Sequence, residues 1–192
     1  MESLLEKAER VSAQWHKEAN NTYGGQPYTV HLDMVDGFAV FYEYLIPSMY
    51  IDLVRAGCRF HDIIEDTTKT YNDVKAEMGL FVAEFSYALA NEKGRTRKER
   101  AKAKYYKGIR KVHYAAFIKL CDRLANVNYS KNMRSSMFYK YKQENDSFCK
   151  SLYGPWWIRF LQFFGLFKNI ENIKSKYHDM FEHLDVILKE NL

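Results

Sequence analysis

The segment FHDIIEDT (60–67) places His61, Asp62, Glu65 and Asp66 within six residues. On a helix, His61 and Glu65 lie four residues apart, as do Asp62 and Asp66, and side chains with this spacing share a face. Such groups are costly to bury unless something balances their charge. A divalent metal ion would hold an imidazole and a carboxylate together without leaving an unpaired charge. The segment is therefore a candidate metal site on a helix.

Helical patterns extend on both sides of this segment. Positions 31, 35, 38, 42 and 45 are His, Val, Phe, Tyr and Leu, and their spacing of 4, 3, 4 and 3 marks one face of a helix. Further helices are predicted over 3–19, 50–66, 71–91 with a break at Met78-Gly79, 113–130, 133–152 and 169–190. A turn-rich loop is predicted at 20–27. We expect an all-α, single-domain helical bundle over 1–192.

Two further candidate ligands lie on other helices. His31 interrupts its apolar stripe, and Asp122 lies in IKLCDRLANV (118–127), where Ile118 and Ala125 share its face. Taken alone, His31 could be a satisfied core histidine and Asp122 could pair with Arg123. If three helices converge, His31, His61, Asp62 and Asp122 form a site with two imidazoles and two carboxylates. Such mixed nitrogen and oxygen ligation suits Mn²⁺, Fe²⁺ or Zn²⁺ better than Ca²⁺.

Composition limits the class of protein. Lys and Arg number 29 against 24 Asp and Glu, and the formal net charge of +5 suits a small anionic substrate as well as a nucleic acid. Three widely spaced cysteines form no CxxC pair, which favours a reducing, cytoplasmic setting. The first residues are charged, unlike a signal peptide. The longest apolar stretch, 156–167, is too short to span a bilayer, so no transmembrane segment is expected.

Three segments together resemble the HD-domain phosphohydrolases, above all the RelA/SpoT-type hydrolase domain and its small stand-alone relatives that hydrolyse alarmones. FHDIIEDT is similar to the LHDxxEDT segment of that family. PYTVH (27–31) is similar to PYxxH, and IKLCDRLANV is similar to IKLADRLxN, in the same order. The resemblance covers roughly residues 8–145, followed by a helical extension over 146–192. It implies an all-α HD-type domain.

The resemblance also implies a chemistry. It implies one metal ion, usually Mn²⁺ with Fe²⁺, Zn²⁺ or Mg²⁺ as alternatives, bound by His31, His61, Asp62 and Asp122. Glu65 and Asp66 match the carboxylates that position and activate the attacking water, and Asn126 matches a residue near the nucleotide sugar. The family reaction removes the 3′-pyrophosphate from guanosine tetra- or pentaphosphate, (p)ppGpp. The expected partner is therefore a small-molecule nucleotide.

Basic and aromatic residues could contact such a nucleotide. Lys93 and Arg97 belong to a basic run that could offset phosphate charge, although a solvated helix face is the default reading of such a run. Tyr141 could stack on a base. The family usually has an Arg-Lys pair before PYxxH. The corresponding residues of this chain, 18–25, contain neither Arg nor Lys. Adenine alarmones, NADPH and simple nucleotides therefore stay open as substrates.

Three other interpretations remain. The chain could be a non-catalytic nucleotide-binding module, although such a module has little reason to retain every group of HDxxED. A nucleic-acid binder is supported only by the Lys and Arg run. The aromatic segment 156–167 is expected to be a buried helix or a contact between copies of the chain, with a membrane-surface role as a lesser alternative.

Overall fold

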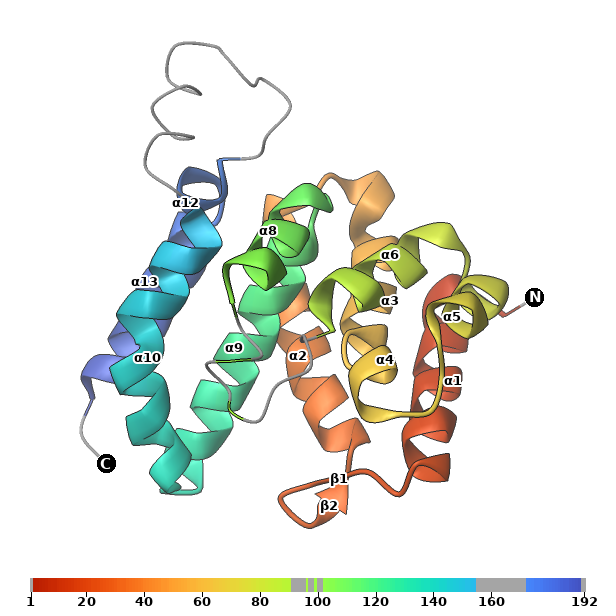
Figure 1. The fold of residues 1–192 in the computed structure, drawn as a ribbon, viewed down its shortest axis with the longest axis horizontal. Coiled ribbons are helices and arrows are strands. Elements are labelled where there is room, and N and C mark those ends of the chain that lie inside the picture. The colour runs from red at the N-terminus through yellow and green to blue at the C-terminus, as the bar shows by residue number, and fades with distance from the viewer. Residues whose placement is uncertain (1, 91–95, 97–98, 100–101, 155–171, 191–192) are drawn as a thin grey trace. The chain divides into compact units, whose positions relative to one another are not determined.

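The structure is a computed structural model that describes residues 2–90, 96, 99, 102–154 and 172–190. These residues are mostly helical, and their strands are the short β1 (Thr22–Tyr23) and β2 (Gln26–Pro27), so the predicted all-α class is confirmed (Figure 1). The chain divides into two compact units, Met1–Glu92 and Lys93–Leu192. A single domain over 1–192 stays a prediction. The basic residues Lys93 and Arg97 and the segment 156–167 lie outside the described residues.

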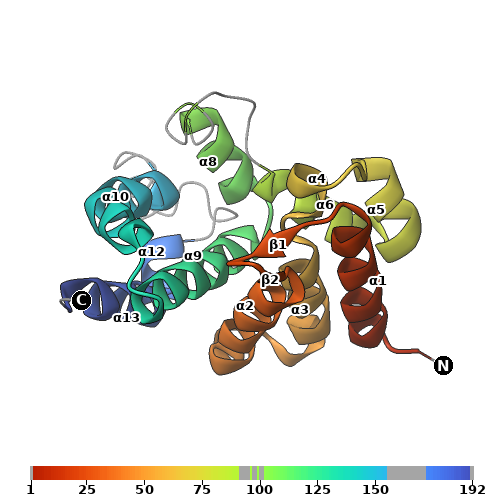
Figure 2. The ribbon, with the colours of Figure 1, turned by 90° about the horizontal axis from the view of Figure 1, so that it is seen from below.

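Helix α3 is the centre of the first unit. This unit contains α1 (Leu4–Glu18), α2 (Thr29–Phe41), η1 (Glu43–Leu45), η2 (Ser48–Tyr50), α3 (Ile51–Phe60), α4 (Ile63–Asp66), α5 (Tyr71–Met78) and α6 (Leu80–Leu89). Helix α3 packs against α1, α2 and α6, and Figure 2 shows it between α1 and α2. Phe60, the last residue of α3, and His61, which follows it, are both buried.

Local signals set several of these boundaries. Ser3 caps α1 and Thr70 caps α5, each in a reciprocal capping box with an acidic residue three positions later. The predicted break at Met78-Gly79 is confirmed, because Gly79 has a φ of +86° that L side chains rarely adopt. The predicted loop at 20–27 contains the β1–β2 hairpin. Gly24 and Gly25 form its two-residue turn, both with positive φ, as a type I′ turn requires.

The predicted continuous helix over 50–66 is wrong in one respect. Helix α3 ends at Phe60 and α4 begins at Ile63, so His61 and Asp62 lie between two helices. Side chains contact backbone carbonyl groups there. The Ser86 hydroxyl donates to the Phe60 carbonyl at 2.7 Å, and His61 Nδ1 lies 2.7 Å from the Cys58 carbonyl. Both carbonyl groups thus contact side chains at the point where α3 ends. The residues with the candidate chemistry therefore lie at a bend.

The residues on both sides of this bend belong to a buried hydrophobic cluster. Phe60 and Ile63 are fully buried among residues of α1, α3, α5 and α6, and the Phe60 ring meets Trp15 edge-on at 5.6 Å. Burying an aromatic ring of this size contributes strongly to stability. The residues on either side of His61 and Asp62 are thus anchored in the core.

Replacing Phe60 should test this anchoring. We expect Phe60→Ala to lower the free energy of unfolding by about 3–5 kcal/mol, because it leaves a cavity in the cluster. Phe81, on α6, is 63% exposed, and Phe81→Ala should change the free energy of unfolding by no more than about 0.5 kcal/mol. Urea denaturation measures both values. Equal losses in the two variants would contradict this account of the core.

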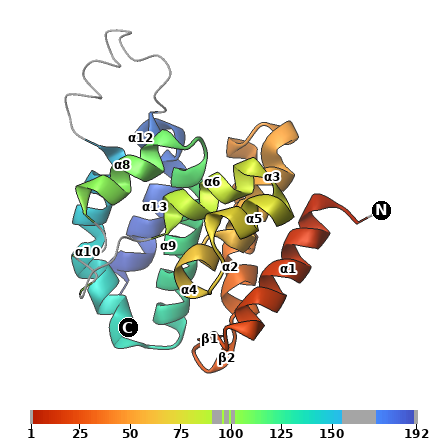
Figure 3. The same ribbon diagram turned by 45° about the vertical axis from the view of Figure 1, so that its right-hand side comes forward.

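The second unit is built around helix α9. Its helices are α8 (Ala103–Lys111), α9 (Ala115–Asn132), α10 (Ser136–Tyr153), α12 (Ile173–Lys176) and α13 (His178–Lys189). Helix α9 packs against α10 and α13, which lie side by side (Figures 1 and 3). The predicted apolar face is confirmed, because Phe117, Cys121 and Leu124 are buried. Tyr177 separates α12 from α13 within the predicted final helix. Among the described residues, no helix is long and apolar enough to cross a membrane.

Candidate metal centre

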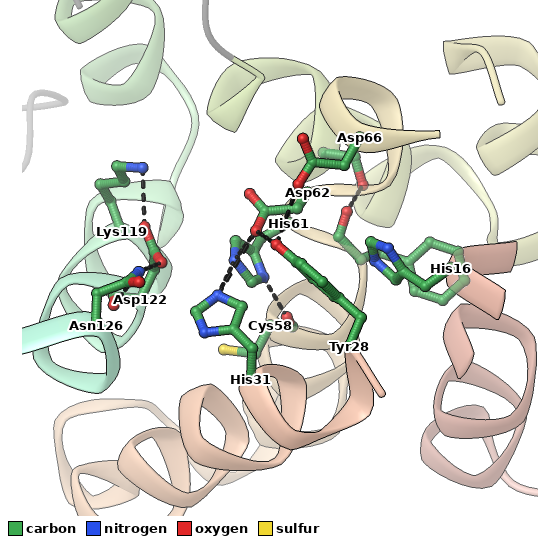
Figure 4. A network of polar contacts seen from close by, with 12 residues as sticks. His16, Tyr28, His31, Cys58, His61, Asp62, Asp66, Lys119, Asp122 and Asn126 are labelled. Carbon is green, nitrogen blue, oxygen red and sulfur yellow. Dashed lines mark hydrogen bonds and ion pairs between the residues drawn. The ribbon is translucent and has the colours of Figure 1, made fainter. Parts of the chain in front are cut away.

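Two buried imidazoles meet between α2 and α3. His31 lies in the first turn of α2, and His61 follows the last residue of α3. Their Nε2 atoms are 3.2 Å apart, and each residue is 1% exposed (Figure 4). The predicted convergence of these two histidines, which are 30 positions apart in the chain, is therefore present within the first unit.

Asp62 adds a carboxylate to the two imidazoles. Its Oδ2 atom lies 2.8 Å from His61 Nε2 and 3.6 Å from His31 Nε2. The bend after α3 turns this carboxylate toward the two rings, as Figure 4 shows. Two imidazole nitrogens and one carboxylate oxygen thus face a common point. Together they could hold a divalent metal ion.

The hydrogen bond on the far side of the His61 ring fits a metal ligand. His61 Nδ1 lies 2.7 Å from the Cys58 carbonyl, which can only accept, so Nδ1 carries a proton. In the neutral ring, Nε2 then presents a lone pair to the Asp62 carboxylate. Two acceptors 2.8 Å apart repel each other unless a cation or a proton lies between them. Donation of the second ring N–H to a backbone carbonyl is the usual arrangement for a metal-bound histidine.

Asp66 and Glu65 extend the acidic group along α4. Partial desolvation raises the pKa of Asp66 to about 6, and the carboxylates of Asp62 and Glu65 act in the same direction. The Tyr28 hydroxyl lies 2.5 Å from Asp62 Oδ2 and 3.1 Å from Asp66 Oδ2. One phenol therefore connects the carboxylate beside the imidazoles to a second carboxylate, whose pKa is raised to about 6.

Aromatic residues from α1 and the hairpin surround this group. The Tyr23 ring stacks on His31 at 4.7 Å, and the Tyr28 ring stacks on His16 at 4.1 Å. Asn21 Nδ2 donates to the Asp66 carbonyl at 2.8 Å. Sequence reasoning did not assign a role to Tyr28 or Tyr23. For Tyr28 a signal existed, because it lies in PYTVH, but the partner of its hydroxyl depends on how α2 packs against α3.

A buried ion-pair network also joins α2 to α3. Arg55 donates to both Asp36 oxygens at 2.8 Å, and Arg59 Nη2 donates to Asp36 Oδ2 at 3.1 Å. Arg59 also donates to Asp33 through Nη1. Asp36 and Arg59 are buried, so each charge relies on the other. The network holds together the two helices that position His31 and His61.

Removing the shared carboxylate should destabilise the first unit. We expect Asp36→Ala to lower the free energy of unfolding by about 3–5 kcal/mol, since it leaves the buried Arg59 guanidinium without this partner. Lys150 and Asp146 form an ion pair with side chains 76% and 91% exposed. Lys150→Ala should therefore change the free energy of unfolding by less than about 0.5 kcal/mol. Chemical denaturation of both variants would test the contrast, and a small loss for Asp36→Ala would contradict it.

The burial of His16 predicts a pH-dependent stability. Desolvation lowers the pKa of His16 to about 4, so the folded protein keeps this ring neutral where the unfolded chain protonates it. The resulting stability is complete above about pH 6.5 and is lost as the pH falls toward 4. Between pH 7.5 and 4.5, metal-free wild type should lose about 2–3 kcal/mol more than His16→Phe. Urea titrations at both pH values measure this, and equal losses would refute it.

Asp122 lies in the middle of α9, in the second unit. Its Oδ2 lies 2.9 Å from Lys119 Nζ, and its Oδ1 accepts from Asn126 Nδ2 at 2.5 Å (Figure 4). Lys119 and Asn126 lie three and four positions away, so both share the face of Asp122. The buried carboxylate thus has a cation and an amide to balance it.

Arg123, the next residue along α9, packs against aromatic rings. Its guanidinium lies 4.5 Å from the ring centres of both Tyr141 and Phe148, and 3.8 Å from a Glu144 oxygen. Tyr141 is buried, and one of its contacts is this cation–π interaction. The printed partners of the Asp122 carboxylate are Lys119 and Asn126, and the alternative pairing of Asp122 with Arg123 stays a prediction.

The described chain is an all-α fold that brings together two imidazoles and a carboxylate. In particular, the structure is similar to a solved structure described as a metazoan ortholog of SpoT that hydrolyzes ppGpp and plays a role in starvation responses. The match has a TM-score of 0.60 and 18% sequence identity, and it covers 94% of each chain. The predicted resemblance is confirmed for the fold. No protein-family model and no curated protein matches the sequence.

Proposed function

We propose that this protein is a divalent-metal-dependent phosphohydrolase of a nucleotide phosphate. The observation that carries the proposal is the convergence of two imidazoles and a carboxylate: His61 Nε2 lies 2.8 Å from Asp62 Oδ2 and 3.2 Å from His31 Nε2. This donor set calls for a cation. The likeness in fold to a protein that hydrolyzes ppGpp supports phosphate chemistry at such a site.

The proposed metal ligands are His31, His61, Asp62 and Asp122. The first three face one another within the first unit. Asp122 is proposed as the fourth because its motif, IKLCDRLANV, matches the family's ligand segment. Mn²⁺ is the proposed metal, with Fe²⁺, Zn²⁺ or Mg²⁺ as alternatives. When bound, such a cation supplies Lewis acidity, which lowers the pKa of water and offsets charge on phosphorus oxygens.

Glu65 and Asp66 are proposed to orient the attacking water and accept its proton. The pKa of Asp66, raised to about 6, supports this role because a general base works best when its pKa is close to the operating pH. Asn126 is proposed to lie near the nucleotide sugar, and Lys93 and Arg97 near the phosphates. Tyr141 stays a predicted contact of the nucleotide base. The base would stack on the same Tyr141 ring that the Arg123 guanidinium contacts.

The proposed substrate is (p)ppGpp, from which the enzyme would remove the 3′-pyrophosphate. The hairpin before PYTVH has no basic residue from Ala19 to Pro27, so its contacts with a purine would have to be aromatic or polar. For this reason adenine alarmones, NADPH and nucleoside phosphates belong in the same test. A cytoplasmic location and self-association stay predictions.

The test combines metal binding with a nucleotide panel. Purified protein should bind Mn²⁺ and release pyrophosphate or phosphate from at least one of these nucleotides. We expect His61→Ala and Asp122→Ala to lose Mn²⁺ binding because each removes a ligand. Glu65→Gln should retain Mn²⁺ but lower turnover by about 10²–10⁴-fold, since it removes a general base.

The matched control is Glu182→Gln, which makes the same change at an exposed carboxylate on α13. It should alter neither Mn²⁺ binding nor turnover. Isothermal titration calorimetry and product release separate the two properties. The enzymatic function is lost if no nucleotide is cleaved by the Mn²⁺-loaded protein. Loss of Mn²⁺ in Glu65→Gln would overturn the division between ligands and base.

A further inference from the structure

The Asp62 carboxylate has a contact on the side away from the imidazoles. The Tyr28 hydroxyl donates to Asp62 Oδ2 at 2.5 Å, while His61 Nε2 lies 2.8 Å from the same oxygen. An O–H···O⁻ bond of this length is charge-assisted and among the stronger hydrogen bonds in proteins. A single carboxylate oxygen is therefore held between a phenol and an imidazole.

We infer that Tyr28 is a positioning residue for the metal site: its hydroxyl fixes the orientation of the Asp62 carboxylate and thereby sets the affinity for the metal. The inference rests on the proposed function, because it takes Asp62 as a ligand. Tyr28 acts through Asp62 and is not itself a ligand. Hydrogen-bond partners of metal ligands typically account for 10–100-fold in metal affinity.

The Tyr28 ring is held by packing, so its hydroxyl is directed before any metal binds. One face of the ring stacks on His16 at 4.1 Å, with the planes inclined by 21°. Tyr23 and His31 meet the ring at steep angles, with centroids 6.3 Å and 5.4 Å away. Tyr28 also immediately precedes α2, the helix of His31. A ring held in this way loses little further freedom when its hydroxyl bonds to Asp62.

The same hydroxyl connects the ligand to the proposed base. Its oxygen lies 3.1 Å from Asp66 Oδ2, and the loop is tied to Asp66 a second time by Asn21 at the main-chain carbonyl. A phenol has one proton, so it can donate to only one carboxylate at a time. The shorter distance identifies Asp62 as the acceptor. Loss of the hydroxyl would therefore release the Asp62 carboxylate.

The decisive variant is Tyr28→Phe, which keeps the ring and removes only the hydroxyl. Tyr71→Phe is the matched control, because the Tyr71 hydroxyl also donates to a carboxylate, Glu84, at 2.6 Å in the same unit. Mn²⁺ affinity is measured by electron paramagnetic resonance titration without nucleotide. We expect Tyr28→Phe to bind Mn²⁺ about 10–100-fold more weakly than wild type, and Tyr71→Phe to stay within about twofold. Circular dichroism compares the folding of the two variants.

A second measurement separates positioning from a general loss of structure. If Tyr28 acts through metal affinity, raising Mn²⁺ to saturation should recover most of the lost turnover. Wild-type Mn²⁺ affinity in Tyr28→Phe, or an equal loss in Tyr71→Phe, would overturn the inference. Weaker Mn²⁺ binding in Tyr28→Phe alone supports it even if no nucleotide is cleaved, and in that case only the proposed function fails. Absence of Mn²⁺ binding in wild type would overturn both.

Discussion

The contact between His61 and Asp62 is the constraint on which the first unit depends. His61 Nδ1 lies 2.7 Å from the Cys58 carbonyl, and Nε2, on the other side of the ring, lies 2.8 Å from Asp62 Oδ2. The His31 imidazole, on α2, lies 3.2 Å from the same nitrogen. When both rings are neutral, these three acceptors repel one another, and a cation between them makes the arrangement favourable. Buried contacts around the three groups hold them in place.

A buried apolar cluster and a buried ion-pair network hold these three groups in place. Phe60 and Ile63 anchor the chain on either side of the bend in a buried apolar cluster. The pairing of Asp36 with Arg55 and Arg59 joins the helices that carry the two histidines. Each is more costly to break than an exposed contact, because it would leave a cavity or an uncompensated buried charge. Rigid elements of this kind suit a metal site, whose ligands must keep their geometry.

The likeness to the metazoan SpoT ortholog concerns the fold, and a fold by itself does not define a reaction. The proposal of phosphate hydrolysis relies on the donor atoms and on the raised pKa of Asp66. In the first unit, Asn21 donates to the Asp66 carbonyl, Tyr23 stacks on His31 and the Tyr28 hydroxyl donates to Asp62. No basic residue lies between Ala19 and Pro27, so this part of the chain offers aromatic and polar side chains to the site.

The sequence alone determined the all-α class, the break at Gly79 and the pairing of His31 with the His61-Asp62 segment. These follow from the spacing of apolar residues, from a glycine within a helical pattern and from three short motifs. Only the tertiary structure decided that the helix bends after Phe60, that Tyr28 bonds to Asp62, and that Arg59 is buried against Asp36. Periodicity reports which face of one helix is apolar. The partner of a polar side chain depends on how that helix packs against another, and no local pattern encodes that packing.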